Sequence, residues 1–153
     1  MHLMPTATTV PDFGCTCARL RKLTRRLTRI YDAHLSAQAI KVTQYSLLAN
    51  AAQGDRTLTE FAAELEMDRS TLSRNLAPLV AQGWVTVSVG DDPRSRSISV
   101  TAAGRRKLKA ALPLWRKAQC EVEATLGAAN VGELHRRVKH ALTALPVTTG
   151  KHS

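Results

Sequence analysis

The sequence has few aromatic residues and no long apolar segment. Aromatic side chains make up only 4% of the 153 residues, which argues against a stacking surface for single-stranded nucleic acids. No apolar run approaches the roughly 18 residues that a membrane helix needs. The first residues also lack a basic segment followed by an apolar one, which is the pattern of an export signal. We therefore expect a cytoplasmic protein with no membrane partner.

Cysteine is scarce as well, and the patterns of the common catalytic sites are missing. The three cysteines are an odd number without a disulfide framework, which fits a reducing compartment. Cys15 and Cys17 supply only two metal ligands, whereas a closed site takes about four. No nucleophile–base pair, glycine-rich phosphate loop or metalloprotease helix is present. We predict a protein with no enzymatic activity, metal or cofactor.

Acidic residues are outnumbered, and this imbalance is the first positive indication of a partner. Lys and Arg total 22 against 12 Asp and Glu, so the formal net charge is +10. Such a charge indicates a polyanionic partner, although a basic protein that is merely soluble has the same composition. Hydrophobic residues make up 44%, so the chain can form one domain with a single core, or a small domain plus an oligomerisation element.

Apolar spacing and capping residues predict a mainly α-helical fold with one small β-hairpin. Thr57 and Glu60 form a capping box, and Asp68 is placed to cap the helix that follows. Thr43 and Thr101 are plausible caps of two further helices. Alternating β-branched residues then predict a strand that pairs back across a turn. The predicted helices are 15–36, 43–54, 57–65, 68–83, 102–126 and 131–145, and the predicted strands are 84–89 and 97–100.

The long helices at the two ends carry apolar stripes that one small helical unit cannot cover. We expect the end helices of two chains to interleave as a homodimer, which would double the contacts with a two-fold DNA site. Between them lies a winged unit, meaning the short helices followed by the hairpin. The predicted organisation is a tail at 1–13, a domain at 14–146, with dimerisation helices at 14–36 and 102–146 and the winged unit at 43–100, and a second tail at 147–153.

The helix predicted from Asp68 presents a polar surface that suits the major groove of DNA. Its apolar positions point inward and leave arginine, asparagine and hydroxyl side chains exposed in the first turns. Arginine can donate a fork to guanine, asparagine can pair with adenine, and hydroxyls suit phosphates or base edges. An ordinary solvated helix face is the alternative, and the basic hairpin that follows argues against it. The predicted DNA-binding residues of this helix are Arg69, Ser70, Thr71, Ser73, Arg74 and Asn75.

The turn of the predicted hairpin is rich in arginine. Arg94 and Arg96 lie near its tip, where an arginine can enter the adjacent, narrow minor groove. Asp92 can orient Arg94 through a charge-assisted hydrogen bond. Solubilising charges on a loop are the alternative interpretation. Together with the preceding helices, this hairpin predicts double-stranded DNA as the partner.

Four segments of the sequence resemble the MarR family of bacterial transcriptional regulators. They match the family's winged helix-turn-helix, its D-x-R wing and its L-T-x-x-G helix start, and the resemblance covers roughly residues 14–146. It implies an obligate homodimer, usually a repressor, that binds a pseudo-palindromic operator. It also implies release from DNA by a small phenolic or aromatic acid, or by oxidation of a cysteine. The segments are Leu65–Arg74, Leu79–Val85, Asp92–Arg96 and Val100–Gly104.

A redox-active thiol is one possible input. In the branch of the family that senses organic peroxides, the reactive cysteine matches Cys17, and Tyr31 matches one of the two tyrosines that hydrogen-bond it. Val42 stands at the second tyrosine position, which departs from that branch. Cys15 lies beside Cys17, and basic residues near a helix N-terminus suit a reactive thiol. Two free thiols without a sensing role are the alternative.

A small-molecule pocket is the other possible input. We expect it between the dimer helices and the winged unit, lined by the first, second and fifth helices. Arg19 or Arg21 can pair with a carboxylate, and Tyr45 and Trp115 can contact an aromatic ring. Each of these residues can equally be an ordinary core or surface residue. The sequence thus predicts a homodimeric repressor released by an aromatic acid effector, with a thiol-based sensor or an effector-independent architectural DNA-binding protein as alternatives.

Overall fold

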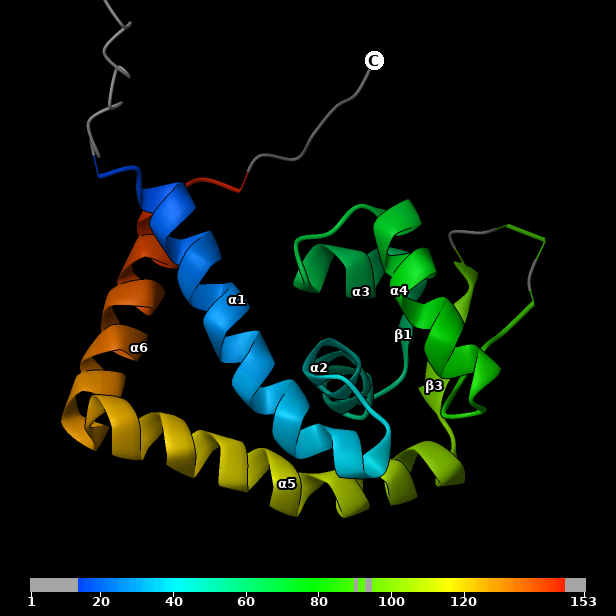
Figure 1. The fold of residues 1–153 in the computed structure, drawn as a ribbon. Coiled ribbons are helices and arrows are strands. Elements are labelled where there is room, and N and C mark those ends of the chain that lie inside the picture. The colour runs from blue at the N-terminus through cyan, green and yellow to red at the C-terminus, as the bar shows by residue number, and fades with distance from the viewer. Residues whose placement is uncertain (1–13, 90, 93–94, 148–153) are drawn as a thin grey trace, which may run out of the picture.

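The computed structural model describes residues 14–89, 91–92 and 95–147 of the chain. In Figure 1, α5 runs along one edge of the molecule and α6 turns back from its far end, while α2, α3 and α4 lie with the strands on the other side of α1. The elements of the described residues are α1 (Thr16–Leu35), the 3-10 helix η1 (Ser36–Gln38), α2 (Val42–Ala51), β1 (Arg56–Thr57), α3 (Leu58–Glu64), α4 (Arg69–Ala81), β2 (Val85–Val87), β3 (Ser97–Val100), α5 (Ala102–Leu126) and α6 (Ala128–Ala144).

The capping residues that the sequence predicts are found at the starts of three helices. At α3, the Glu60 amide donates to Thr57 Oγ1 (3.1 Å) and the Thr57 amide donates to Glu60 Oε2 (2.9 Å). At α4, Asp68 Oδ1 accepts a hydrogen bond from the Thr71 amide (2.7 Å). Thr101 caps α5 in the same way. These contacts confirm the predicted starts of α3, α4 and α5.

The predicted cap of α2 is wrong by two residues. Lys41, not Thr43, is the residue that precedes the helix. Two side chains stabilise the earlier start: Asp32 Oδ1 accepts from the Val42 amide (2.8 Å), and Gln44 Oε1 accepts from the Lys41 amide (3.0 Å). The first of these caps comes from α1, so it depends on tertiary structure and leaves no local pattern in the sequence.

The structure also differs from the prediction at α6 and at two of the strands. α6 begins at Ala128 rather than at Val131, because Gly127 alone, with φ of +88°, separates it from α5. β2 is shorter than the predicted strand at 84–89. The strand β1 is not predicted, since two residues are too few to show alternation. β1 pairs with β3, which lies in the middle of an antiparallel sheet of order β1-β3-β2.

One buried core joins the sheet to α2, α3 and α4. Phe61 of α3 and Leu72 and Leu79 of α4 are at most 1% exposed. They belong to one cluster with Leu48 of α2 and Ile98 of β3. The hairpin formed by β2, β3 and their connection is called the wing below. Because α4 and the wing share this core, they are held as one body.

The first turns of α5 are attached closely to the end of α4 and to β2. Thr101 Oγ1 donates to the Gly83 carbonyl (2.6 Å). A Cβ atom on Gly104 would lie 2.2 Å from the Trp84 carbonyl oxygen, so only glycine fits there. The Lys107 ammonium lies 5.3 Å from the centre of the Trp84 ring. α5 is therefore coupled to the winged unit through direct contacts.

The end helices remain partly uncovered in one chain. α1 packs along α5, whereas α6 buries only Val131. Leu142 and Leu145 are 66% and 68% exposed.

The predicted fold class, mainly helical with a small β-hairpin wing, is confirmed. Within the described residues, no helix has the length and apolar character that crossing a membrane requires.

Candidate nucleic-acid interface

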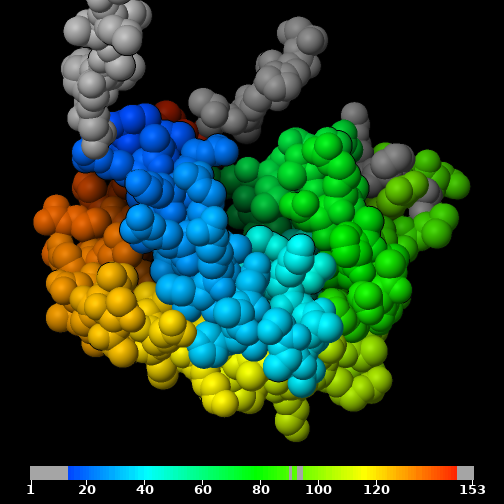
Figure 2. All heavy atoms as spheres, viewed as in Figure 1, coloured from blue at the N-terminus to red at the C-terminus, as the bar shows by residue number. Residues whose placement is uncertain are grey.

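α4 separates an apolar face from a polar one. Leu72, Leu76 and Leu79 are buried against the core, while the opposite side chains are exposed except for the half-buried Thr71. In Figure 2 the surface of α4 lies open on one side of the molecule. A helix of this kind can place its first turns against base edges in the major groove. The polar face holds Arg69, Ser70, Thr71, Ser73, Arg74 and Asn75, so the structure brings these predicted residues together.

Asp68 organises the first turn of α4. Its Oδ1 accepts hydrogen bonds from Ser70 Oγ (2.6 Å) and from the Thr71 amide (2.7 Å), and its Oδ2 accepts from Thr71 Oγ1 (2.7 Å). Arg74 donates in turn to Thr71 Oγ1 at 3.3 Å. Hydrogen bonds from Ser70 and Thr71 hold the pKa of the Asp68 carboxyl far below its usual range. The sequence predicts Asp68 as a cap, but not its contacts with two hydroxyl groups.

The wing is tied to the same unit as α4. The Ser95 amide and hydroxyl both donate to the Asp92 carbonyl, at 3.0 Å and 2.8 Å. The Arg96 carbonyl accepts from the Leu58 amide (2.8 Å) at the start of α3. Asp92 and Arg96 are exposed. Arg94, the predicted minor-groove residue, lies outside the described residues, and so does its predicted contact with Asp92.

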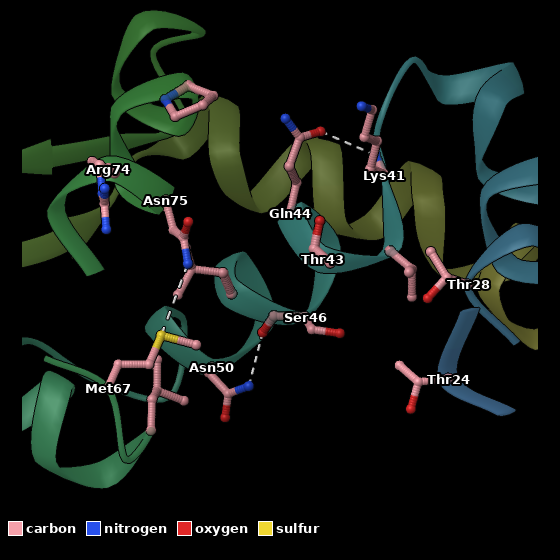
Figure 3. A pocket seen from close by; sticks show the side chains of 14 residues that line it. Thr24, Thr28, Lys41, Thr43, Gln44, Ser46, Asn50, Met67, Arg74 and Asn75 are labelled. Carbon is pink, nitrogen blue, oxygen red and sulfur yellow. Dashed lines mark hydrogen bonds between the residues drawn. The ribbon is translucent and has the colours of Figure 1, made fainter. Parts of the chain in front are cut away.

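A cavity of about 590 Å³ lies between α1, α2 and α4. In Figure 3, Thr24 and Thr28 lie on one side of it, and Arg74 and Asn75 of α4 lie on the other. Two cations, Lys41 and Arg74, are among the described residues that line it, and none of those residues is a carboxylate. Two residues of the polar face of α4 therefore also belong to the cavity. Its apolar wall consists of Val42, Leu47, Leu65, Met67 and Pro78.

The predicted pocket, lined by the first, second and fifth helices, agrees with this cavity at α1 and α2, but α4 lines it and α5 does not. The spacing of small polar residues is a further signal of it. Thr24 and Thr28 stand one turn apart on α1, and Thr43, Ser46 and Asn50 stand one turn apart on α2. Each helix therefore carries short polar side chains along one face. Where these two faces approach α4, such side chains are too short to fill the space between the helices.

The residues predicted to bind an aromatic acid do not line this cavity. Tyr45 is 9% exposed and stacks on Trp115, with ring centroids 6.2 Å apart. Tyr31 lies against the same indole at 6.3 Å. Burial raises the pKa of Tyr45 and of Tyr31. The aromatic rings thus pack on one another at the junction with α5, while Arg19 and Arg21 are exposed on the first turns of α1.

The two N-terminal thiols are exposed at the start of α1. Cys15 Sγ accepts from the Ala18 amide at 3.5 Å and caps the helix. Tyr31 follows Cys17 by 14 residues, about 21 Å along a helix, and its hydroxyl donates to Gln119. The predicted contact of Tyr31 with Cys17 is therefore not made within one chain. In the part of the chain described, no three His, Cys, Asp or Glu side chains gather as a metal site.

Comparison with known proteins places this architecture in a family. The sequence profile of the MarR family matches residues 40–95. The DNA complex of the Mycobacterium tuberculosis transcriptional regulator MosR is 34% identical to the chain, with a TM-score of 0.67, over 83% of this chain and 98% of MosR. A second MosR structure is 35% identical, with a TM-score of 0.68, over 86% and 97% of the two chains. No curated protein sequence matches.

The Escherichia coli MarR complex with operator DNA shares the fold, with a TM-score of 0.73 at 24% identity, over 84% of this chain and 94% of that one. The match to MosR is decisive, since it spans almost the whole relative. The chain belongs to the MarR family of winged-helix transcriptional regulators, which are not enzymes.

Proposed function

We propose that this protein is a homodimeric repressor of transcription that binds a pseudo-palindromic operator in double-stranded DNA. The observation that carries the proposal is the polar face of α4, which gathers the six predicted DNA-binding residues. In a dimer, the two α4 helices would enter successive major grooves about 34 Å apart, with the wings reaching the flanking minor grooves. The MosR and E. coli MarR relatives are in complex with DNA, which supports this function.

The end helices support the homodimer. Leu20 of α1, Leu142 of α6 and Leu145, directly after α6, are 46–68% exposed. Burying one leucine side chain contributes about 1.5–3 kcal/mol, so a second copy that covers these faces would gain stability. Two copies would also present two reading helices to a two-fold operator.

Selection from a pool of randomised 30-base-pair duplexes tests the proposal. The full chain should enrich a two-fold sequence and bind it at least about a thousandfold more tightly than a scrambled duplex. Arg74→Ala should weaken binding to the selected duplex by roughly 5- to 150-fold, or about 1–3 kcal/mol. Arg29→Ala, which removes an exposed arginine from α1, is the matched control and should weaken both duplexes by the same small factor.

An architectural DNA-binding protein would give a different result. It would bind the selected and scrambled duplexes with similar affinity and with the same dependence on salt concentration. That outcome rules out the operator-binding repressor. Equal losses for Arg74→Ala and Arg29→Ala on both duplexes would instead show that Arg74 does not read sequence.

The cavity between α1, α2 and α4 is the site where we place a small-acid effector. Lys41 and Arg74 can pair with a carboxylate, and the apolar wall suits an aromatic or aliphatic body. This location replaces Tyr45 and Trp115, whose rings already pack on each other. A ligand held by Arg74 and Asn75 would favour a conformation in which α4 is unavailable to DNA. The affinity for the operator would then fall by the ratio of the ligand's affinities for that conformation and for the DNA-binding one.

Thermal unfolding with a panel of aromatic acids, including salicylate and benzoate, tests the effector site. An acid at 100 times its dissociation constant should stabilise the protein by about 2.7 kcal/mol and should release the selected duplex. Thr28→Leu would fill part of the cavity, so it should remove the response and leave DNA binding intact. A response that Thr28→Leu leaves unchanged would place the effector elsewhere.

A thiol sensor is the second candidate, favoured by the exposure of both Cys15 and Cys17 at one helix start. Cumene hydroperoxide should then release the protein from the selected duplex, and a reductant should restore binding. Cys17→Ser should abolish this response, with Cys120→Ser as the matched control that keeps it. Release of Cys17→Ser by the peroxide would rule out the thiol sensor.

A further inference from the structure

The carboxylate of Asp68 binds more donors than a helix cap needs. One acceptor for the Thr71 amide is sufficient to cap α4. Asp68 also accepts from the hydroxyl groups of Ser70 (2.6 Å) and Thr71 (2.7 Å). Both hydroxyls belong to the first turn of the polar face that we propose to enter the major groove. The two extra contacts therefore determine how that turn can hydrogen-bond to DNA.

A hydroxyl group has one proton and two acceptor lone pairs. While Ser70 donates its proton to Asp68, its oxygen can only accept a further hydrogen bond. Phosphate oxygens are acceptors too, so Ser70 in this state cannot donate a hydrogen bond to a phosphate. In the major groove, the amino groups of cytosine (N4) and adenine (N6) are the donors that can reach such an oxygen.

Ser70 and Thr71 differ in how accessible their oxygens are. Thr71 is half-buried, and its oxygen already accepts from Arg74 (3.3 Å). Ser70 is exposed. Ser70 is therefore the residue of the pair whose acceptor can meet a base, while Thr71 connects the carboxylate to the guanidinium of Arg74.

The same carboxylate changes how the start of α4 meets the DNA backbone. A free helix N-terminus attracts phosphate through its amides and its dipole. Here the Thr71 amide is already bound by Asp68, which also places a negative charge at this end. The pKa of Asp68 lies far below its usual range, so the charge and its three hydrogen bonds persist throughout the neutral range. Contacts between this end of α4 and the DNA phosphates would therefore be made by arginine side chains.

We infer that Asp68 is a positioning residue for operator specificity: by holding the hydroxyl protons, it makes Ser70 an acceptor that selects cytosine or adenine over guanine or thymine. This inference rests on the proposed binding of α4 in the major groove. One net hydrogen bond supplies roughly a three- to tenfold ratio of affinities. That ratio is the expected preference at one base position in each half of the operator.

The base preferences of Asp68→Ser test this role. The introduced hydroxyl still caps α4, but it cannot accept from both neighbouring hydroxyls. Circular dichroism should therefore show unchanged helix content, while selection from the randomised duplex pool should show the three- to tenfold preference for cytosine or adenine reduced to below about twofold. Affinity for a scrambled duplex should rise, because Ser70 regains a proton for phosphate.

Two further variants separate positioning from charge and from direct contact. Glu66→Gln removes an exposed carboxylate just before α4, so it should raise affinity for all duplexes and leave the base preference unchanged. Ser70→Ala should lose the same base preference as Asp68→Ser, and the double variant should lose no more.

The outcomes distinguish this inference from the proposed function. If the wild-type chain shows no base preference anywhere, the proposed operator binding fails and this inference fails with it. If the wild-type chain is selective but Asp68→Ser or Ser70→Ala keeps every base preference, operator binding stands and the positioning role of Asp68 is overturned. A preference that changes equally in Glu66→Gln also overturns it, since charge alone would then be the cause.

Discussion

The winged unit and the end helices of this protein differ in how complete they are within one chain. In the winged unit, Phe61 and Leu72 are 1% and 0% exposed, and α3 and α4 both begin at hydrogen-bonded side-chain caps. Leu142 of α6 and Leu145, the residue after the helix, are 66% and 68% exposed, and no side chain caps the start of α6. The surface that we propose to contact DNA is thus built by one chain, whereas the outer helices expose leucines that the proposed second copy would cover.

In the proposed dimer, this difference would allow an effector to change DNA binding. A reading unit with its own core keeps its shape when its surroundings change. In the proposed dimer, the spacing between two such units would depend on the end helices, and a modest free energy could alter it. The cavity lies where α1 and α2 meet α4, which is the boundary between the two regions.

Breaking the dimer should have the largest effect. Leu142→Glu places a charge on the exposed apolar face of α6 and should yield a monomer by light scattering. Because a monomer engages only half of a two-fold operator, affinity for the selected duplex should fall by more than about a hundredfold. Gln53→Glu, which adds the same charge at an exposed position beyond α2, should leave both mass and affinity unchanged. A dimeric Leu142→Glu would show that this face of α6 is not the interface.

Disturbing the contact between α5 and the winged unit should have an intermediate effect on stability. The Cβ of Gly104→Ala would lie 2.2 Å from the Trp84 carbonyl oxygen, so the backbones must separate. We expect a loss of about 1–3 kcal/mol in the free energy of unfolding, measured with urea at fixed protein concentration.

Gly132→Ala in α6 is the matched control for that variant. A Cβ there would meet nothing within 4 Å, and alanine favours a helix interior over glycine by about 0.5–1 kcal/mol. The two substitutions should therefore shift stability in opposite directions. A Gly104→Ala protein as stable as the wild type would show that α5 can move relative to β2 without cost.

The same contrast decides what the sequence can predict. A cap and its partner lie three residues apart, so the sequence alone predicts the caps at Thr57, Asp68 and Thr101. The structure confirms all three. The cap of α2 by Asp32 joins two helices and is not legible. The sequence predicts a pocket at the first and second helices, but it does not predict that α4 lines the cavity. Nor does it predict the stacking of Tyr45 on Trp115, which fills the position where a ligand ring is expected. Local sequence patterns do not predict contacts that form between segments far apart in the chain.

The smallest effect should come from acid acting on the caps of the winged unit. The Thr57 amide and hydroxyl, in that order, hold the pKa of Glu60 below its ordinary value. Because the pKa is lower in the folded state, the Glu60 charge stabilises the fold fully above its unfolded pKa near 4.5, and this contribution is lost as the pH falls through the folded value. Glu60→Gln keeps a side chain that can accept from the Thr57 amide but cannot titrate, so the urea midpoint of the wild type should exceed that of Glu60→Gln at pH 7 and converge with it by about pH 3. Glu66→Gln, which alters no cap, should show no such convergence. A gap between wild type and Glu60→Gln that is constant from pH 7 to pH 3 would mean that the cap acts through its shape alone, and the winged unit would then owe nothing to the charge at this position.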